Sequence, residues 1–180
     1  MSRRPLDHDE LVGLLNELAD ELDRAATKPV DVRIVGGAAV SAVYNAERDV
    51  TDDVDCLESS DASAVAAAAV AVARRHDLDD DWVNFKVRMY APDPMYPPPE
   101  WVVFLERSNV RLLVANPRLL LAMKIKANRP NRDFADIEVL LGACRITTYV
   151  DALACFEEHY TTEAVAPRAE AYLRAKLDPT

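Results

Sequence analysis

The first part of the chain alternates helix-like and strand-like hydrophobic patterns. Leucines recur with helical spacing across residues 6–25, which predicts an amphipathic helix. They are Leu11, Leu14, Leu15, Leu18 and Leu22. Short apolar runs at 32–35 and 54–57 predict buried strands, with a helix over 38–45 between them. Asp61 is a good N-cap for the alanine-rich helix that follows the second strand.

The rest of the chain begins with helix breakers and ends in helices. Prolines crowd residues 91–99, which predicts an exposed loop. Apolar runs at 101–105 and 109–115 predict two strands joined by a short turn. Helices are then expected at 117–128, 131–141, 149–160 and 163–176, the second of them capped by Asn131.

This order of elements predicts a single domain of the α/β (α+β) class with a helical C-terminal part. The chain has 180 residues, half of them hydrophobic, which is enough apolar side chain for a core. We expect a core at 1–145 and a C-terminal helical extension of the same domain at 146–180. No apolar stretch is long enough for a transmembrane helix, and residues 1–7 lack the apolar run of a signal peptide.

Charge and cysteine content narrow the function classes. A net charge of −10 argues against a surface that coats nucleic acid in general. The segment from Arg107 to Arg132, however, holds cations and no acidic residue: Arg107, Arg111, Arg118, Lys124, Lys126, Arg129 and Arg132. These are either solvated helix charges or a local surface for a polyanion. Cys56, Cys144 and Cys155 have no C-x-x-C spacing, which predicts reduced, buried thiols in a cytoplasmic protein.

Two features carry chemistry. Gly36 and Gly37 stand between a predicted strand and a predicted helix, where backbone N–H groups can face an anion, although many such pairs are only tight turns. Asp53 and Asp55 are two positions apart, so on a strand both carboxylates point to one face. Two carboxylates on a rigid face suit Mg²⁺, which keeps room for waters and phosphates. Together they predict an enzyme that handles a nucleoside triphosphate.

Further residues complete a known pattern. Arg48 and Thr51 extend it to R-x-x-T-x-D-x-D after the glycine turn, and here the chain resembles the nucleotidyltransferase superfamily of the DNA polymerase β type. Residues 119–140 resemble the K-x-x-A-x-R … [KR]-D-x-x-D-[IL]-x-x-L segment of abortive-infection and toxin–antitoxin nucleotidyltransferases. The stretch Asp81-Trp82-Val83-Asn84 also resembles a short signature of minimal members. The resemblance extends over about 32–141.

The resemblance implies a small mixed-sheet nucleotidyltransferase core that moves a nucleotide from an NTP to an acceptor hydroxyl with Mg²⁺. Asp53 and Asp55 would be catalytic and would hold the metal. The nucleotide would be bound by residues around the turn: Gly36, Gly37, Arg48 and Thr51.

The second motif contributes three further candidates. By the resemblance Lys124 contacts the phosphates, where a cation offsets developing charge; otherwise it is a helix lysine that reaches solvent. Asp133 and Asp136 share a helix face. Asp133 is assigned to nucleotide binding, although the helix dipole favours a carboxylate in a first turn in any case. Asp136 is the expected orienting residue or base.

The chain departs from the superfamily pattern at two points. Ala38 replaces the serine that many members use to bind a phosphate, which leaves that contact to backbone N–H groups. Polymerase-like members also bring a third carboxylate from a later strand, and here Glu100 and Glu106 flank a predicted strand without matching a clear pattern. The histidines, His8, His76 and His159, lie far from the motifs in sequence and are expected on the surface.

Three hypotheses for the acceptor and the function remain open. The resemblance favours a tRNA 3′ end, in a protein that acts as the toxin of a toxin–antitoxin pair, with the basic segment as a landing site for RNA. A small hydroxylated cation such as an aminoglycoside is the second acceptor, because the chain is acidic and Asp79–Asp81 form an acidic loop. The third hypothesis is a catalytically silent binding module, supported by the missing third carboxylate.

Overall fold

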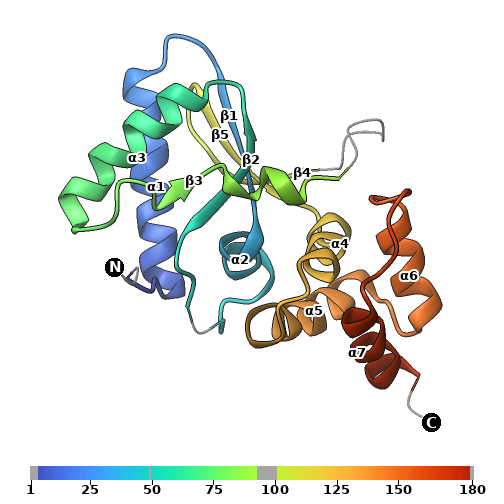
Figure 1. Cartoon of the computed structure of the whole chain (residues 1–180). Coiled ribbons are helices and arrows are strands. Elements are labelled where there is room, and N and C mark those ends of the chain that lie inside the picture. Colours follow the sequence, from blue (N-terminus) through green and yellow to red (C-terminus); the bar gives the residue numbers. More distant parts are fainter. Residues whose placement is uncertain (1–3, 49, 93–100, 179–180) are drawn as a thin grey trace. The chain divides into compact units, whose positions relative to one another are not determined.

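The computed structural model describes residues 4–48, 50–92 and 101–178, and its secondary structure is a mixture of helices and one mixed sheet (Figure 1). The expected α/β (α+β) class is confirmed. The chain forms two compact units, Met1–Met89 with Trp101–Ala115, and Tyr90–Glu100 with Asn116–Thr180. The boundary expected at residue 145 falls inside the second unit.

A five-stranded sheet with the order β3-β2-β1-β5-β4 forms the centre of the first unit. The strands are β1 (Val30–Val35), β2 (Val54–Ser59), β3 (Val83–Asn84), β4 (Trp101–Glu106) and β5 (Val110–Ala115). β1 runs parallel to β5 and antiparallel to β2, β3 runs parallel to β2, and β4 runs antiparallel to β5. The four predicted strands are confirmed, whereas the two-residue β3 was not predicted.

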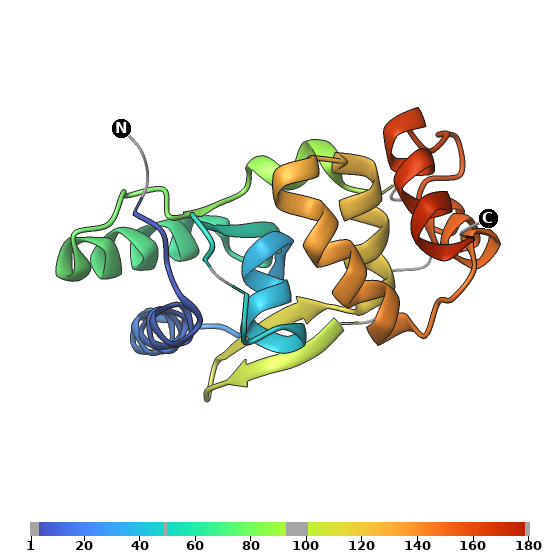
Figure 2. The same cartoon turned by 90° about the horizontal axis from the view of Figure 1, so that it is seen from below.

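The two faces of the sheet differ in polarity. One face is apolar and fully buried, and it includes Val32, Ile34, Cys56, Leu112 and Val114. Helices α1 (His8–Ala25) and α3 (Ala62–His76) pack against each other and against the sheet (Figures 1 and 2). The opposite face carries ion pairs between neighbouring strands, Arg33 with Glu58 and Arg111 with Asp31. The strand register places Asp55 and Asn84 on this polar face.

Local capping explains where α1 and α3 begin. The side chain of Asp7 accepts a hydrogen bond from the N–H of Glu10, and that of Asp61 accepts one from the N–H of Ala64. Such caps stabilise a helix by roughly 1 kcal/mol because they satisfy an orphan donor of the first turn. The predicted cap at Asp61 and the buried leucine face of α1 are therefore confirmed.

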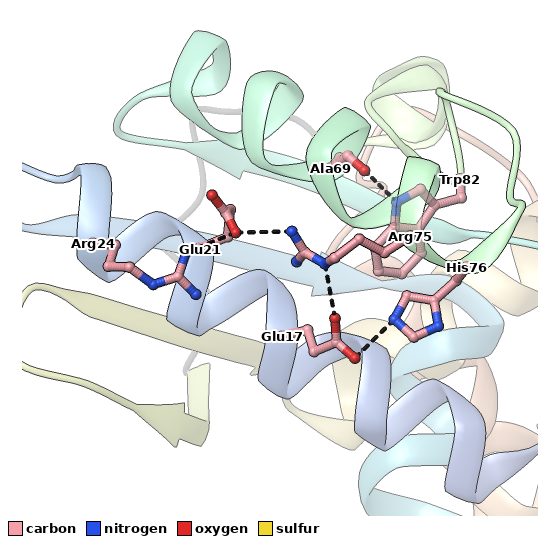
Figure 3. A network of polar contacts seen from close by, with 7 residues as sticks. All are labelled: Glu17, Glu21, Arg24, Ala69, Arg75, His76 and Trp82. Atoms are coloured by element: carbon pink, nitrogen blue, oxygen red, sulfur yellow. Dashed lines mark hydrogen bonds and ion pairs between the residues drawn. The ribbon is translucent and has the colours of Figure 1, made fainter.

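Polar side chains join α1 to α3 (Figure 3). Glu17 on α1 accepts from Arg75 Nε at 3.3 Å and lies 2.8 Å from His76 Nε2, and Arg75 also donates to Glu21 at 3.1 Å. The hydrogen bond with His76 is the main cause that lowers the pKa of Glu17. These pairs are partly exposed, so each adds little stability. Their effect is to set how the two helices align, and His76 is engaged rather than a lone surface histidine.

The helix that follows β1 begins at the first glycine of the turn, Gly36. It consists of α2 (Gly36–Ala39) and a π-helical turn, Val40–Tyr44. The predicted helix at 38–45 is confirmed, with a start two residues earlier. Tyr44 anchors the π-helical turn to the sheet, because its hydroxyl donates to the carbonyl of Ala115 at 3.1 Å. Such turns are rare, and they occur often at functional sites.

The second unit is helical, with α4 (Pro117–Ala127), α5 (Pro130–Cys144), α6 (Tyr149–Glu157) and α7 (Pro167–Leu177). The predicted cap at Asn131 is wrong: Arg129 is the N-cap and Pro130 occupies the first turn, where its missing N–H costs nothing. α7 likewise starts at its proline, four residues later than expected. Within the described ranges, no single helix has the length and hydropathy to cross a membrane.

Thiol labelling tests the burial of the cysteines. All three are unbridged; Cys56 and Cys155 are buried and Cys144 is half-buried. Burial raises the pKa of Cys56 and of Cys155 to about 12. At pH 8 we therefore expect maleimide to label Cys144 first and the other two only after unfolding, as followed by mass spectrometry. Rapid labelling of Cys56 in the native protein would contradict this burial.

Candidate functional site

The glycine turn and the carboxylate pair meet in the first unit. The antiparallel register of β1 and β2 places Val35 opposite Asp55, so Gly36 follows directly beside that carboxylate. Gly36 has φ +71°, and a Cβ added there would lie 2.6 Å from Asp55 Oδ2. Glycine is required twice, because the conformation is left-handed and the carboxylate occupies the space of a side chain. The Asp55 carboxylate therefore lies against the glycine turn.

Arg48 and Thr51 close around the same turn. A Cβ at Gly37 would lie 3.0 Å from Arg48 Nη2 and 3.1 Å from Thr51 Oγ1. Thr51 is buried, and its hydroxyl donates to the carbonyl of Asp53 at 3.1 Å. The Arg48 guanidinium donates to the carbonyl of Val50. The structure thus brings together the residues that the first motif singled out.

Asp53 immediately precedes β2, and a neighbour that sequence reasoning missed holds its carboxylate. Asn84 Nδ2 donates to Asp53 Oδ2 at 3.0 Å. Asn84 is only 6% exposed and is paired with Asp55 in the register of β2 and β3. The stretch 81–84 resembles a family signature, but a two-residue strand has no periodicity from which this contact could be inferred.

Of the two acids that flank the predicted strand at 101–105, Glu106 lies apart from the carboxylate pair. Glu106 lies on β4, which β1 and β5 separate from β2, and it pairs with Arg111 at the strand end remote from Val35. Glu100 lies outside the described residues. Across 4–48, 50–92 and 101–178, no three His, Cys, Asp or Glu side chains gather closely enough to hold a metal. Ala38 is fully buried and offers no hydroxyl.

A divalent cation nevertheless fits the two carboxylates. Mg²⁺ is commonly bound through one or two carboxylates, while waters and phosphate oxygens complete its shell. The Asp55 carboxylate fills the space that a Cβ at Gly36 would take, so an ion held there would lie next to the turn. The donor set of Asp53 and Asp55 therefore suits a metal that is shared with a phosphate.

The second motif forms a buried ionic cluster in the helical unit. Lys124 on α4 is 4% exposed, and its Nζ lies 2.8 Å from Asp133 Oδ1 and 2.7 Å from Asp136 Oδ2. Both aspartates are buried on α5. The alternative that Lys124 is a helix lysine that reaches solvent is therefore wrong. An ammonium group has three donors, so two carboxylates leave a third donor for another acceptor.

Asp133 binds side chains as well as the backbone N–H groups that a carboxylate in a first helical turn commonly accepts from. It accepts from the backbone N–H and the Nε of Arg129, both at 2.9 Å, in addition to Lys124. Burial by itself raises the pKa of Asp133, but the hydrogen bonds from Arg129 and the charge of Lys124 outweigh it and lower the pKa. Asp133 thus stays ionised and fixes the two cations. Arg129, the arginine of the K-x-x-A-x-R segment, joins the cluster although no role in the site was expected for it.

Carboxylates neutralise the basic segment. Six of its cations form ion pairs: Arg107 with Asp20, Arg111 with Asp31, Arg118 with Glu158, Lys124 with Asp133 and Asp136, Lys126 with Glu163, and Arg129 with Asp133. The cations also belong to two different units. A continuous basic surface for RNA is therefore not supported by these contacts.

An open depression lies beside Arg48. Its volume is about 480 Å³, and Arg48 lines it together with Asp7, His8, Asp9 and Glu47. His8 is thus closer to the first motif than its sequence position suggested. Three carboxylates and one guanidinium line it, so the net charge of the lining favours a cation over an anion.

Comparisons with protein-family models, with curated proteins and with solved structures found no match to this chain. The functional assignment consequently rests on the geometry above and on the motif resemblance.

The glycine turn gives a direct test of this geometry. Gly36→Ala is expected to destabilise the protein by about 1–2 kcal/mol for the left-handed backbone and to displace the Asp55 carboxylate. Gly13→Ala on α1 is the control, because a Cβ there meets nothing within 4 Å. It should stabilise the helix by roughly 0.5–1 kcal/mol. Urea unfolding measures both variants, and equal stability of the two would refute the arrangement at Gly36.

Proposed function

We propose that the protein is a Mg²⁺-dependent nucleotidyltransferase, which moves a nucleotide from an NTP to an acceptor hydroxyl. The observation that carries the proposal is the contact between the Gly36 turn and the Asp55 carboxylate, with Asp53 one residue before β2. In this arrangement a turn that can bind an anion is adjacent to a carboxylate pair that can bind a cation.

Each residue of the first unit has a distinct task in this proposal. Backbone N–H groups at the glycine turn bind phosphate oxygens, and Arg48 beside Gly37 adds a positive charge. Asp53 and Asp55 hold the metal, which when bound neutralises phosphate charge and orients the triphosphate. Thr51 fixes the backbone at Asp53 through its hydroxyl.

The residues of the second unit are assigned by the resemblance. Lys124 stabilises the charge on the transferred phosphoryl group, and Asp133 and Asp136 orient its ammonium group. The short, nearly buried contacts support a fixed direction for that ammonium group. Asp136 then acts by orienting Lys124, which fits its 2.7 Å contact better than the role of a base.

The proposed acceptor is the 3′ end of a tRNA, in the cytoplasm where NTPs and tRNA occur together. The resemblance to toxin–antitoxin nucleotidyltransferases carries this proposal, and it also suggests an antitoxin protein as a partner. The ion-paired segment 107–132 lends it no support.

A small cationic acceptor is the alternative that one observation favours. The depression beside Arg48 is lined by Asp7, Asp9 and Glu47, and carboxylates of this kind suit an aminoglycoside or a similar polycation. In this alternative the NTP site is unchanged and only the acceptor differs.

One experiment separates these functions. The protein is incubated with each labelled NTP and Mg²⁺, once with total tRNA and once with a set of aminoglycosides. We expect label at tRNA 3′ ends with one NTP, and none after addition of EDTA. Labelled aminoglycoside instead would replace the acceptor. Absence of both NTP binding and transfer would support a silent binding module.

A further inference from the structure

Asn84 lies on the strand beside the two candidate metal ligands, and its side chain is an amide and not an acid. It is on β3, paired in register with Asp55, and its Nδ2 donates to Asp53 Oδ2 at 3.0 Å. One buried amide therefore contacts the Asp53 carboxylate, and it belongs to the residue paired in register with Asp55. Its 6% exposure means that solvent does not compete strongly for this hydrogen bond.

The orientation of the amide is fixed from two sides. Asn84 Oδ1 accepts from the backbone N–H of Lys86 at 2.9 Å, which leaves Nδ2 to face Asp53. β3 is itself anchored, because the buried Trp82 donates from Nε1 to the carbonyl of Ala69 on α3 at 2.9 Å (Figure 3). Asn84 is thus held on a rigid element, as a group that must orient a ligand has to be.

We infer that Asn84 is a positioning residue that fixes the Asp53 carboxylate for a divalent cation shared with Asp55. This inference rests on the proposed function, because it requires that the two carboxylates bind a metal. A donor at this position stabilises the ionised carboxylate and restricts its rotation.

An amide at this position differs from an acid in its charge and in its inability to act as a base. A third carboxylate beside Asp53 and Asp55 would add like-charge repulsion in the metal-free protein, whereas the amide adds a donor and no charge. The amide cannot accept a proton from an acceptor hydroxyl. β3 therefore supplies a group that orients the Asp53 carboxylate and does not supply a base. Glu106, on β4, is also remote from this carboxylate.

Metal titration tests the inference without any need for catalysis. Mn²⁺ binding is measured by calorimetry for the wild type, Asn84→Ala, Asp55→Ala and Lys86→Ala. Asn84→Ala should weaken Mn²⁺ binding by roughly 10–100-fold, the usual effect of removing a partner of a metal ligand. Lys86→Ala is the matched control, because it keeps the backbone N–H and removes only an exposed pair with Asp81.

The outcomes distinguish this inference from the proposed function. Wild-type-like Mn²⁺ affinity in Asn84→Ala, with loss in Asp55→Ala, would overturn the role of Asn84 and leave the metal site standing. A lower melting temperature with unchanged affinity would have the same meaning. No Mn²⁺ binding by the wild type, or binding that ignores Asp55→Ala, would overturn the metal site and the proposed function together.

A second variant keeps the test decisive if Asn84→Ala does not fold. Asn84→Asp preserves the shape of the side chain and adds a charge beside Asp53. Without metal its melting temperature should fall below that of the wild type, and saturating Mn²⁺ should raise it by more than in the wild type. An equal or smaller gain would show that position 84 does not act on the metal site.

Discussion

Asp53→Ala and Asp55→Ala are each expected to lower nucleotide transfer by at least about a hundredfold while the protein stays folded. In the proposed function both carboxylates hold the metal, so neither can replace the other. Turnover at saturating NTP measures the effect, with Asp52→Ala as the adjacent acidic control that should retain activity. Full activity in both variants would rule out the metal assignment.

The two variants should differ in stability. Asp55→Ala removes one of two negative charges that stand two positions apart in the sequence, so its melting temperature should hold or rise slightly. Asp53→Ala leaves the buried Nδ2 of Asn84 without its acceptor, which costs about 1–3 kcal/mol. Thermal unfolding separates the two, and a larger loss in Asp55→Ala would contradict the contact between Asp53 and Asn84.

Lys124→Ala is expected to cost about 3–5 kcal/mol of unfolding free energy, in addition to a roughly hundredfold loss of turnover. The reason is that Asp133 and Asp136 are buried and share this cation. Lys126→Ala, two residues further along α4, is the control, since its pair with Glu163 is partly exposed and contributes about 0–1 kcal/mol. Urea unfolding gives the first quantity and initial rates at low temperature give the second.

A compensated variant separates the structural and the chemical role of Lys124. Combining Lys124→Ala with Asp133→Asn and Asp136→Asn removes the uncompensated negative charges and should recover part of the stability. Activity should stay low, because no cation remains to stabilise the phosphoryl group. Recovery of activity along with stability would show that Lys124 acts only on folding.

Local patterns in the sequence predicted most elements of the fold. Amphipathic periodicity identified α1, and alternating or continuous apolar runs identified four strands. The start of α5 was misplaced because two local signals compete there, and the proline at its first turn prevails over a cap at Asn131. β3 is too short for any period, and the carbonyl of Trp82 bonded to the N–H of Val54 brings it to β2.

The candidate site divided into a predictable and an unpredictable part. The contact of the Gly36 turn with Asp55 follows from motif spacing. The glycines come directly after β1, the aspartates lie at the start of β2, and these two strands are antiparallel neighbours. The partner of Asp53 does not, since Asn84 is 31 positions away in sequence. The ionic partners of the basic segment also come from remote positions, as Arg107 with Asp20 shows at a separation of 87. Charge runs in a sequence reveal no such neutralisation.

The central parallel pair of the sheet has a consequence for how the chain folds. β1 pairs with β5 from Val30↔Val110 onward, and residues Asp31 and Arg111 in this pair are 80 positions apart. Closing so long a loop costs entropy before any contact rewards it, so pairing at this distance is slow. The antiparallel partner β2 is nearer in sequence and is synthesised first, whereas β5 can pair with β1 only after residues 110–115 have been synthesised. Until then β1 exposes an open hydrogen-bonding edge, which makes this interval the one in which the nascent chain is most prone to aggregate.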